Sequence, residues 1–377
     1  MTGRYSYYVA DLGTGVVRDE LPLRGVSFST ALNDAGEFRG QLVLGDPRIA
    51  VHEPSTAVAP GRTALYVERD GVPVWGGVVW TSRYSSADRT IEIDAAGFLS
   101  YFDHRRVLPS TYDSAADDLA TLATSYTDVD QTEIVRDLVR QAQAQPGGDI
   151  GIEPAETEPA AAPILRTISY PGAQLKSVGE ALRELAALED GPDVLFDVAH
   201  APGGGMVRRL LVGTPMLGQQ GSPYVWEYGA NLVSYTWSED GSSTANRIFA
   251  LGGTRDGDQG QLIAVAADQT TGSPLAETEV SYLDIMEPDV LRSHATAALA
   301  AVSRPVVLPE LTVRADLDPV LGSYHVGDDA LIVINDAFFA AGVQFSARII
   351  GIAVTPGDDA AEEEVQLTVS PLQNGPA

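Results

Sequence analysis

The chain has 377 residues, a length that favours two or three domains and allows a large buried core. It contains no cysteine, which excludes disulfides, thiolate metal ligands and cysteine nucleophiles. Its 24 basic and 52 acidic residues give a net charge of −28, which argues against binding nucleic acid through phosphates, and no run of about 18 apolar residues predicts a membrane span. Lys176 is the one lysine, and either a GC-rich coding bias or a halophile's acidic surface explains the preference for arginine.

The first part of the chain contains a β-meander. Residues 65–69 and 74–82 are strand-like runs on either side of Asp70-Gly71, a dipeptide that favours a tight hairpin turn. After a second reversal, apolar residues alternate with acids over residues 90–94, as in a half-buried strand. Gly76-Gly77 lies inside the middle strand, where glycine indicates a bulge or a close backbone approach. The meander carries no group equipped for catalysis.

Helix signals follow in the middle of the chain. Ser114 and Asp130 each precede an acid by three residues, namely Asp117 and Glu133, which is typical of helix N-termini. An amphipathic helix is expected after the second of these signals. Residues 145–163 are rich in Pro, Gly, Ala and Glu and predict an exposed loop.

The clearest helix of the chain comes next. It begins at Ser177, which forms a capping box with Glu180, and it ends at Gly191-Pro192. Residues 193–199 and 207–212 then predict two strands that pair as a hairpin across a glycine-rich turn. This region is therefore expected to form a small α/β subdomain.

The last part of the chain returns to strand patterns, first at residues 232–238 and 247–251. Pro288 and Arg304-Pro305 frame a helix over residues 289–302, because proline is tolerated at a helix start and cannot continue a helix. Four further strands are expected at residues 311–315, 329–335, 345–355 and 365–370.

Several features occur in an order that resembles a known family. They are a short N-terminal strand, the segment FSTALNDAGEFRGQLVL at residues 28–44, a W-G-G strand at residues 75–80, and a D-A-x-G-F-x-x-Y-F-x-x-R pattern at residues 93–106. This arrangement resembles the opening of tail-hub (minor tail) proteins of siphophages that infect actinobacteria, the group often called Gp37-like, with a gp27-like baseplate hub fold. The resemblance covers most of the chain, although the loop at residues 145–163 matches nothing in it.

The resemblance implies an α+β, mainly β fold. Two β-barrel-like tail-hub domains, residues 1–108 and 227–377, would flank a smaller inserted helical and α/β region, residues 109–226. It implies a structural, non-enzymatic protein made in the host cytoplasm and located at the tail tip of the virion. There a homotrimeric ring would join the tail tube to the tip and surround the DNA exit channel. The implied partners are further copies, a distal tail or tail-tube protein, the tape-measure protein and tip or receptor-binding proteins, with no sequence-specific nucleic acid binding and no membrane insertion.

The residues themselves predict no catalytic, cofactor-binding or metal site. Lys176 does not belong to a phosphate-binding loop, and no G-x-S-x-G nucleophile elbow occurs. The five histidines lack the spacing of zinc ligands and are interpreted as packed or surface residues: His52, His104, His200, His294 and His325.

Two turns and the tryptophans are weaker candidates for binding. Asp256 and Asp258 resemble half of a calcium loop without the remaining ligands, so an acidic turn is favoured and cation binding is left open. Asp11 to Gly15 lacks the third glycine and the helix of a dinucleotide site and predicts a hairpin. Four tryptophans lie in strand patterns and are expected in the core more than in sugar stacking: Trp75, Trp80, Trp226 and Trp237.

Two alternative functions remain beside the structural hub. A tail-tip cell-wall hydrolase would require an additional catalytic domain, and the predicted domains already account for the whole length of the chain. A carbohydrate-binding tail-tip module would require exposed tryptophans, for which Trp80 is the candidate. Neither alternative has a motif in the sequence, so the hub is favoured.

Overall fold

The structure is a computed structural model, and its description covers residues 3–45, 53–113, 115–155, 163–188, 190–213, 216–254, 260–268, 274–282, 285, 288–303, 306–357 and 363–372. Strands hold 47% of the residues and helices 15%, which confirms a mainly β fold. The chain forms two compact units, Met1–Tyr235 with Glu310–Ala377, and Thr236–Pro309. The predicted boundaries near residues 108 and 226 differ from these limits, and the three-domain division stays a prediction. Among the described helices, none combines the length and the apolar character needed to cross a bilayer.

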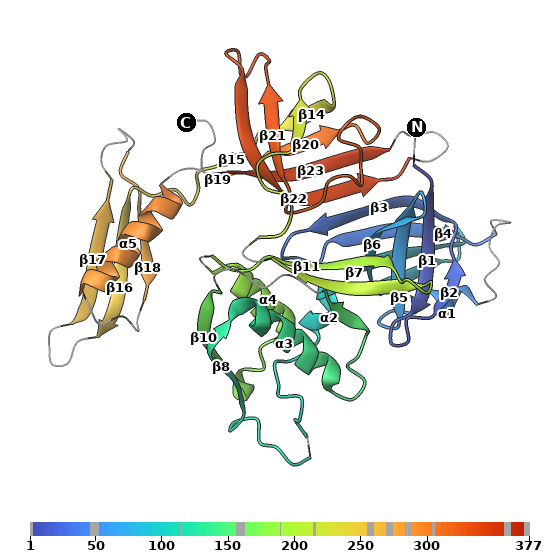
Figure 1. The fold of residues 1–377 in the computed structure, drawn as a ribbon, viewed down its shortest axis with the longest axis horizontal. Helices are drawn as coiled ribbons and strands as arrows, with labels where there is room; N and C mark the ends of the chain where they lie inside the picture. Colours follow the sequence, from blue (N-terminus) through green and yellow to red (C-terminus); the bar gives the residue numbers. More distant parts are fainter. Residues whose placement is uncertain are drawn as a thin grey trace. The chain divides into compact units, whose positions relative to one another are not determined.

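The N-terminal strands of the larger unit form an antiparallel sheet (Figure 1). Its order is β2-β1-β5-β6-β7-β4-β3, so the strands expected from the meander are neighbours. A short helix, α1 (Pro54–Ala57), precedes β5. The strands are β1 (Tyr5–Asp11), β2 (Val17–Glu20), β3 (Leu23–Ala31), β4 (Glu37–Val43), β5 (Thr63–Arg69), β6 (Val72–Ser85) and β7 (Thr90–Gly97).

The meander confirms the predictions made from its turn and its glycines. Asp70 and Gly71 have φ values of 53° and 78°, as the tight turn between β5 and β6 requires. A Cβ atom on Gly77 would lie 2.2 Å from the carbonyl oxygen of Ala96, so glycine permits the close approach of β6 to β7. Gly76 plays a similar part on the other side, where an added Cβ would lie 2.5 Å from Val198.

The C-terminal strands of the larger unit continue the same sheet. Strand β22 pairs with β3, and their register places Val354 opposite Phe28 and Gly351 opposite Ala31 (Figure 1). The two ends of the sequence thus meet inside one 13-stranded sheet, in which the order β13-β21-β22-β23-β20-β14 describes the C-terminal part. These strands are β13 (Tyr224–Glu227), β14 (Leu232–Thr236), β20 (Glu310–Val313), β21 (Asp329–Ile334), β22 (Val343–Thr355) and β23 (Glu364–Pro371).

The prediction of barrel-like domains needs correction, because no sheet formed by the described strands closes into a barrel. The C-terminal part comes nearest to closure. Its outer strands β13 and β14 follow each other along the chain and are linked by one isolated bridge, between Tyr228 and Leu232. Among the described strands, β13 and β14 do not pair with each other beyond that bridge, and no other described strand covers their outer edges. The apolar interior is nevertheless dense, with Trp226 and Ile332 fully buried.

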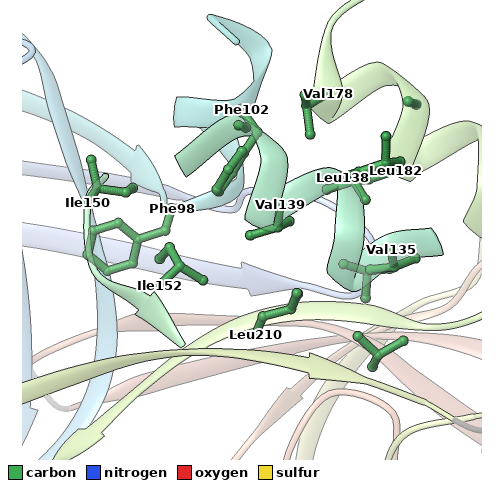
Figure 2. Close-up of a cluster of buried hydrophobic side chains, with 14 of the residues drawn as sticks. Phe98, Phe102, Val135, Leu138, Val139, Ile150, Ile152, Val178, Leu182 and Leu210 are labelled. Atoms are coloured by element: carbon green, nitrogen blue, oxygen red, sulfur yellow. The ribbon is translucent and has the colours of Figure 1, made fainter. Parts of the chain in front are cut away.

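A second layer covers the N-terminal sheet. Its core brings Phe98 and Phe102 from the end of the meander against Val135, Leu182 and residues of a small sheet (Figure 2). That sheet has the order β11-β12-β9, with β11 and β12 antiparallel as predicted. The elements of this layer are α2 (Leu99–Asp103), β8 (Ala123–Asp130), α3 (Gln131–Ala144), β9 (Ile152–Pro154), β10 (Leu165–Pro171), the 3₁₀ turn η1 (Gly172–Gln174), α4 (Val178–Ala186), β11 (Val194–His200) and β12 (Met206–Val212).

Two local predictions in this layer are wrong. The segment predicted as an exposed loop, residues 145–163, contains Ile150 and Ile152, which are both buried. Its described part includes β9, which pairs in parallel with β12, because two isoleucines suffice to anchor a Gly- and Pro-rich stretch on the core. Ser114 itself lies outside the described residues, and residues 115–122, where the helix was expected, form turns and no helix.

The predicted helix caps at Asp130 and Ser177 are confirmed. The side chain of Asp130 accepts a hydrogen bond from the N–H of Thr132, and the Ser177 hydroxyl accepts one from the N–H of Glu180. We expect Ser177→Ala to lower the free energy of unfolding by about 1 kcal/mol, because it leaves an N–H of α4 unsatisfied. Denaturant unfolding followed by circular dichroism measures this loss, and an unchanged midpoint would contradict the capping role.

The smaller unit is a three-stranded sheet covered on one face by a helix. Its strands have the order β17-β16-β18, and Leu291, Ala295 and Leu299 of α5 pack on the buried face. The helix predicted at residues 289–302 is thereby confirmed. The elements are β15 (Glu239–Asp240), β16 (Arg247–Thr254), β17 (Gln261–Ala267), β18 (Glu277–Ser281), α5 (Pro288–Val302) and β19 (Val306–Val307).

Candidate assembly surfaces

The described residues contain no group of three or more His, Asp or Glu side chains placed to hold a metal ion. The four histidines within the described residues are dispersed over the fold, and His52 lies outside them. His104 stacks on Trp80, His200 contacts a backbone carbonyl, His294 stacks on Tyr282 and His325 lies beside Asp328. Asp256 and Asp258 also lie outside the described residues.

Two of the four tryptophans, Trp75 and Trp226, are core residues as predicted. Trp75 is 4% exposed and Trp226 is fully buried. Trp80 is half-buried and donates its indole N–H to the hydroxyl of Ser100 at 2.8 Å. Trp237 is half-buried and donates to Glu239 at 2.6 Å. Trp75 and Trp226 therefore offer no face to a sugar, and Trp80 already has one ring face occupied by His104.

The larger unit contains a cleft of about 660 Å³, within the usual size range of ligand pockets. Its walls come from distant parts of the sequence: β6 and β3 on one side, the hairpin of β11 and β12 on another, and the C-terminal half on the third. Apolar lining residues include Trp75, Leu195, Leu211, Val326 and Val354. The cleft exists because β22 pairs with β3 and so brings the C-terminal half over the hairpin.

A buried ion pair fixes one wall of this cleft. Arg69 at the end of β5 donates to both carboxylate oxygens of Glu363, at 2.7 and 2.9 Å, and the Tyr5 hydroxyl donates to the same carboxylate. Burial alone would raise the pKa of Glu363, but the bonds from Arg69 and Tyr5 outweigh it and hold the pKa below its ordinary value of 4.5. Burial and the nearby carboxylate raise the pKa of Tyr5, so its hydroxyl stays protonated. The N-terminal strand is thus tied to the segment that leads into β23.

A second ion pair ties the hairpin to the C-terminal half. Arg348 of β22 contacts the carboxylate of Asp193 and donates to the carbonyl oxygen of Leu217 at 2.8 Å. The carboxylate of Asp193 also accepts from the N–H of Leu217 at 2.7 Å. Both charged side chains are largely buried. Together with the first pair, this contact ties the C-terminal half to the N-terminal sheet and to the hairpin.

An exposed aromatic cluster lies where β21 turns into β22. Phe338 is 69% exposed and packs edge-on against Phe339, while Tyr235 lies between Phe339 and Tyr228. The carboxylate of Asp336 organises the cluster, since it accepts from the Tyr235 hydroxyl at 2.6 Å and from the N–H groups of Phe338 and Phe339. Burial and Asp336 raise the pKa of Tyr235 to about 12. This cluster borders the free edges of β13 and β14 and is a preformed apolar surface.

Sequence reasoning missed both the cleft and the aromatic cluster. The run Phe338-Phe339 is visible as two apolar residues in a turn, a signal that could have indicated an exposed contact surface. No local signal exists for the cleft, because its walls combine residues from Tyr5 to Val354.

Comparison with solved structures identifies the fold as one found in phage tail proteins. The chain is similar to the tail protein from Neisseria meningitidis MC58, with 14% identity, a TM-score of 0.59 and coverage of 97% of this chain and 96% of the other. It is similar to the 43 kDa tail protein of prophage MuSo2 from Shewanella oneidensis, with 14% identity, a TM-score of 0.59 and coverage of 97% and 98%. It is also similar to the prophage tail protein gp18 from Listeria monocytogenes EGD-e, with 13% identity, a TM-score of 0.53 and coverage of 99% and 95%. No family model and no curated protein sequence matches.

Proposed function

We propose that the chain is a structural tail-hub protein of a long-tailed phage, located at the tail tip. The observation that carries the proposal is the fold, which matches phage tail proteins along nearly the whole chain and not in one domain alone. The narrower relation to the hub proteins of actinobacterial phages stays a prediction.

The proposed mechanism is assembly of three copies into a ring that joins the tail tube to the tip and surrounds the DNA exit channel. A closed ring gives each copy the same contacts and covers sheet edges that would otherwise recruit unrelated strands. The aromatic cluster at Phe338 supplies an apolar contact surface of the kind found at interface centres, and the edges of β13 and β14 that no described strand covers offer backbone groups for pairing. The net charge of −28 would disfavour adhesion of DNA to a lumen lined by the acidic surface. The distal tail or tail-tube protein, the tape-measure protein and the tip proteins are the proposed partners.

Light scattering on the purified full chain tests the assembly step. We expect a particle of three times the 39.8 kDa chain mass, and we expect Phe338→Ser to raise the concentration needed for assembly at least tenfold. Tyr84→Ser is the matched control, since Tyr84 is also exposed but lies at the far end of β6. A strict monomer at micromolar concentration would count against the hub. If the Phe338→Ser variant forms trimers at the same concentration as the wild type, a different surface makes the contact between copies.

A further inference from the structure

The sheet of the smaller unit has one covered face and one bare face. Helix α5 packs across the covered face (Figure 1). The alternate residues of the strands point to the opposite face, where Ile263 and Val265 of β17 are 56% and 50% exposed. The register sets Ile263 beside Leu251 and Val265 beside Phe249, and both of these β16 residues are half-buried. The bare face is therefore an apolar surface formed by four side chains: Phe249, Leu251, Ile263 and Val265.

The sequence of β16 and β17 is that of strands buried on both faces. Residues 248–251 and 262–267 are continuous apolar runs, whereas a strand with one face in water normally alternates apolar with polar residues. The neighbouring strand β18 does alternate, and it places Glu277, Glu279 and Ser281 on the bare side. The apolar surface is thus confined to two strands, and an exposed apolar patch with a polar border is typical of a binding surface.

The covered face shows what fits a sheet of this size. A single helix of 15 residues, α5, packs on it. Three strands at a spacing of about 4.8 Å make a surface about 10 Å wide, which is also about the diameter of a helix with its side chains. The bare face has the same dimensions, because the same three strands form it. A second helix therefore fits it.

A carboxylate at the border of the bare face restricts the chemistry of this helix. Glu279 is exposed and lies beside Phe249 across the pair of β18 with β16, and within the described part of the chain no cation pairs with it. Its neighbour Glu277 is already paired with Arg247 at 2.8 Å. Residues 236–309 as a whole contain ten acidic and four basic residues. A helix with lysine or arginine on the side that lies over β18 complements this border.

The same carboxylate argues against the bare face of a second copy as the occupant. A two-fold pairing that sets β18 over β18 would bring Glu279 against its own counterpart. The other two-fold pairing sets β18 over β17 and would bury Glu279 against Ile263 and Val265. The first arrangement opposes like charges and the second removes a charge from water without a partner, so both are unfavourable.

We propose that the bare face binds one amphipathic helix of another protein. Apolar residues at positions i, i+3, i+4 and i+7 of that helix pack on the four side chains of the bare face, and a lysine or arginine on its flank pairs with Glu279. The sheet then lies between two helices, as its continuous apolar strands favour. This contact is separate from the proposed contact between copies at Phe338, so its failure would leave the proposed function standing.

Fluorescence anisotropy with two stapled peptides and the purified full chain tests the charge preference. Both peptides have the same leucine stripe and length, about that of α5, and the staple fixes the helix because a free helix of this length is marginal in water. One peptide carries lysines beside the stripe and the other carries glutamates. We expect the lysine peptide to bind at least about tenfold more tightly, and Glu279→Gln to reduce this ratio. Equal affinities, or no binding of the lysine peptide, would overturn the proposal.

Two variants test whether the peptide binds at the bare face. Ile263→Ser removes an apolar side chain from it, whereas Val16→Ser removes one that is 63% exposed between β1 and β2. We expect both variants to keep the wild-type melting temperature, and only Ile263→Ser to weaken binding of the lysine peptide, by about tenfold, as for the loss of one buried aliphatic side chain. Equal binding by the two variants would mean that the acidic surface attracts the peptide without a site, and it would overturn the proposal. If the peptide dissociates oligomers of the chain, the bare face is a contact between copies and the assignment to another protein is wrong.

Discussion

Arg208→Ala is expected to lower the free energy of unfolding by at least about 3 kcal/mol, because several buried acceptors lose their donor together. Arg208 is 3% exposed and lies on β12, facing the core between the N-terminal sheet and its covering layer. Its guanidinium donates to the hydroxyl of Tyr66 at 2.8 Å, to the carbonyl of Leu12 at 2.6 Å and to the carbonyl of Ile150. The charge also lies 5.0 Å from the ring centre of Phe98.

These contacts join three separate segments, so the loss should affect the whole larger unit. Denaturant unfolding followed by tryptophan fluorescence measures it, since Trp75, Trp80 and Trp226 all lie in that unit. Arg209→Ala is the matched control on the same strand, because the Arg209 side chain is 39% exposed and pairs with Asp197 on the solvent-accessible wall of the cleft. We expect that control to cost about 1 kcal/mol or less. If Arg208→Ala lowers the free energy of unfolding by no more than Arg209→Ala does, water can replace the Arg208 guanidinium with little loss of stability.

The same two arginines show where sequence reasoning ends. The alternation of a strand predicts that Arg208 and Arg209 point to opposite faces, but Leu210 and Leu211 are both apolar and do not decide which face is buried. The structure buries Arg208 with Leu210 and leaves Arg209 with Leu211 in the cleft. Local signals do better where one residue suffices, as at Asp130 and Ser177, whose capping bonds depend on the next three residues only.

Contacts between distant segments carried no local signal. The pairing of β3 with β22 joins residues more than 300 positions apart, and it turns two expected domains into one sheet. The strands themselves were predictable from alternation, whereas closure into barrels depends on how β13 and β14 meet. The cleft follows from the same long-range pairing. It could therefore be found only once the sheet order was known.

Glu363→Gln is expected to destabilise the larger unit by about 3 kcal/mol at neutral pH, because it removes the buried carboxylate beside Arg69 and leaves the guanidinium only the exposed Asp70 at 3.6 Å. The side chains of Arg69 and Glu363 are 11% and 3% exposed, so water replaces the lost contact poorly. The Tyr5 hydroxyl loses the carboxylate that accepts its hydrogen bond. The N-terminal strand thereby loses its contact with the segment before β23. Denaturant unfolding at pH 7 measures the effect.

The pH dependence identifies the charge as the cause. The pKa of Glu363 lies below its ordinary value of 4.5 in the folded chain, so the unfolded chain binds the proton first as the pH falls. The contribution of the pair is complete above pH 4.5 and is lost as the pH falls through the lower folded pKa. The difference in stability between wild type and Glu363→Gln should therefore shrink below about pH 4. Glu92→Gln, which removes the exposed partner of Arg83, is the control and should change stability by less than about 1 kcal/mol at any pH. A difference for Glu363→Gln that stays constant down to pH 3 would mean that packing, and not the charge of the pair, holds the two segments together.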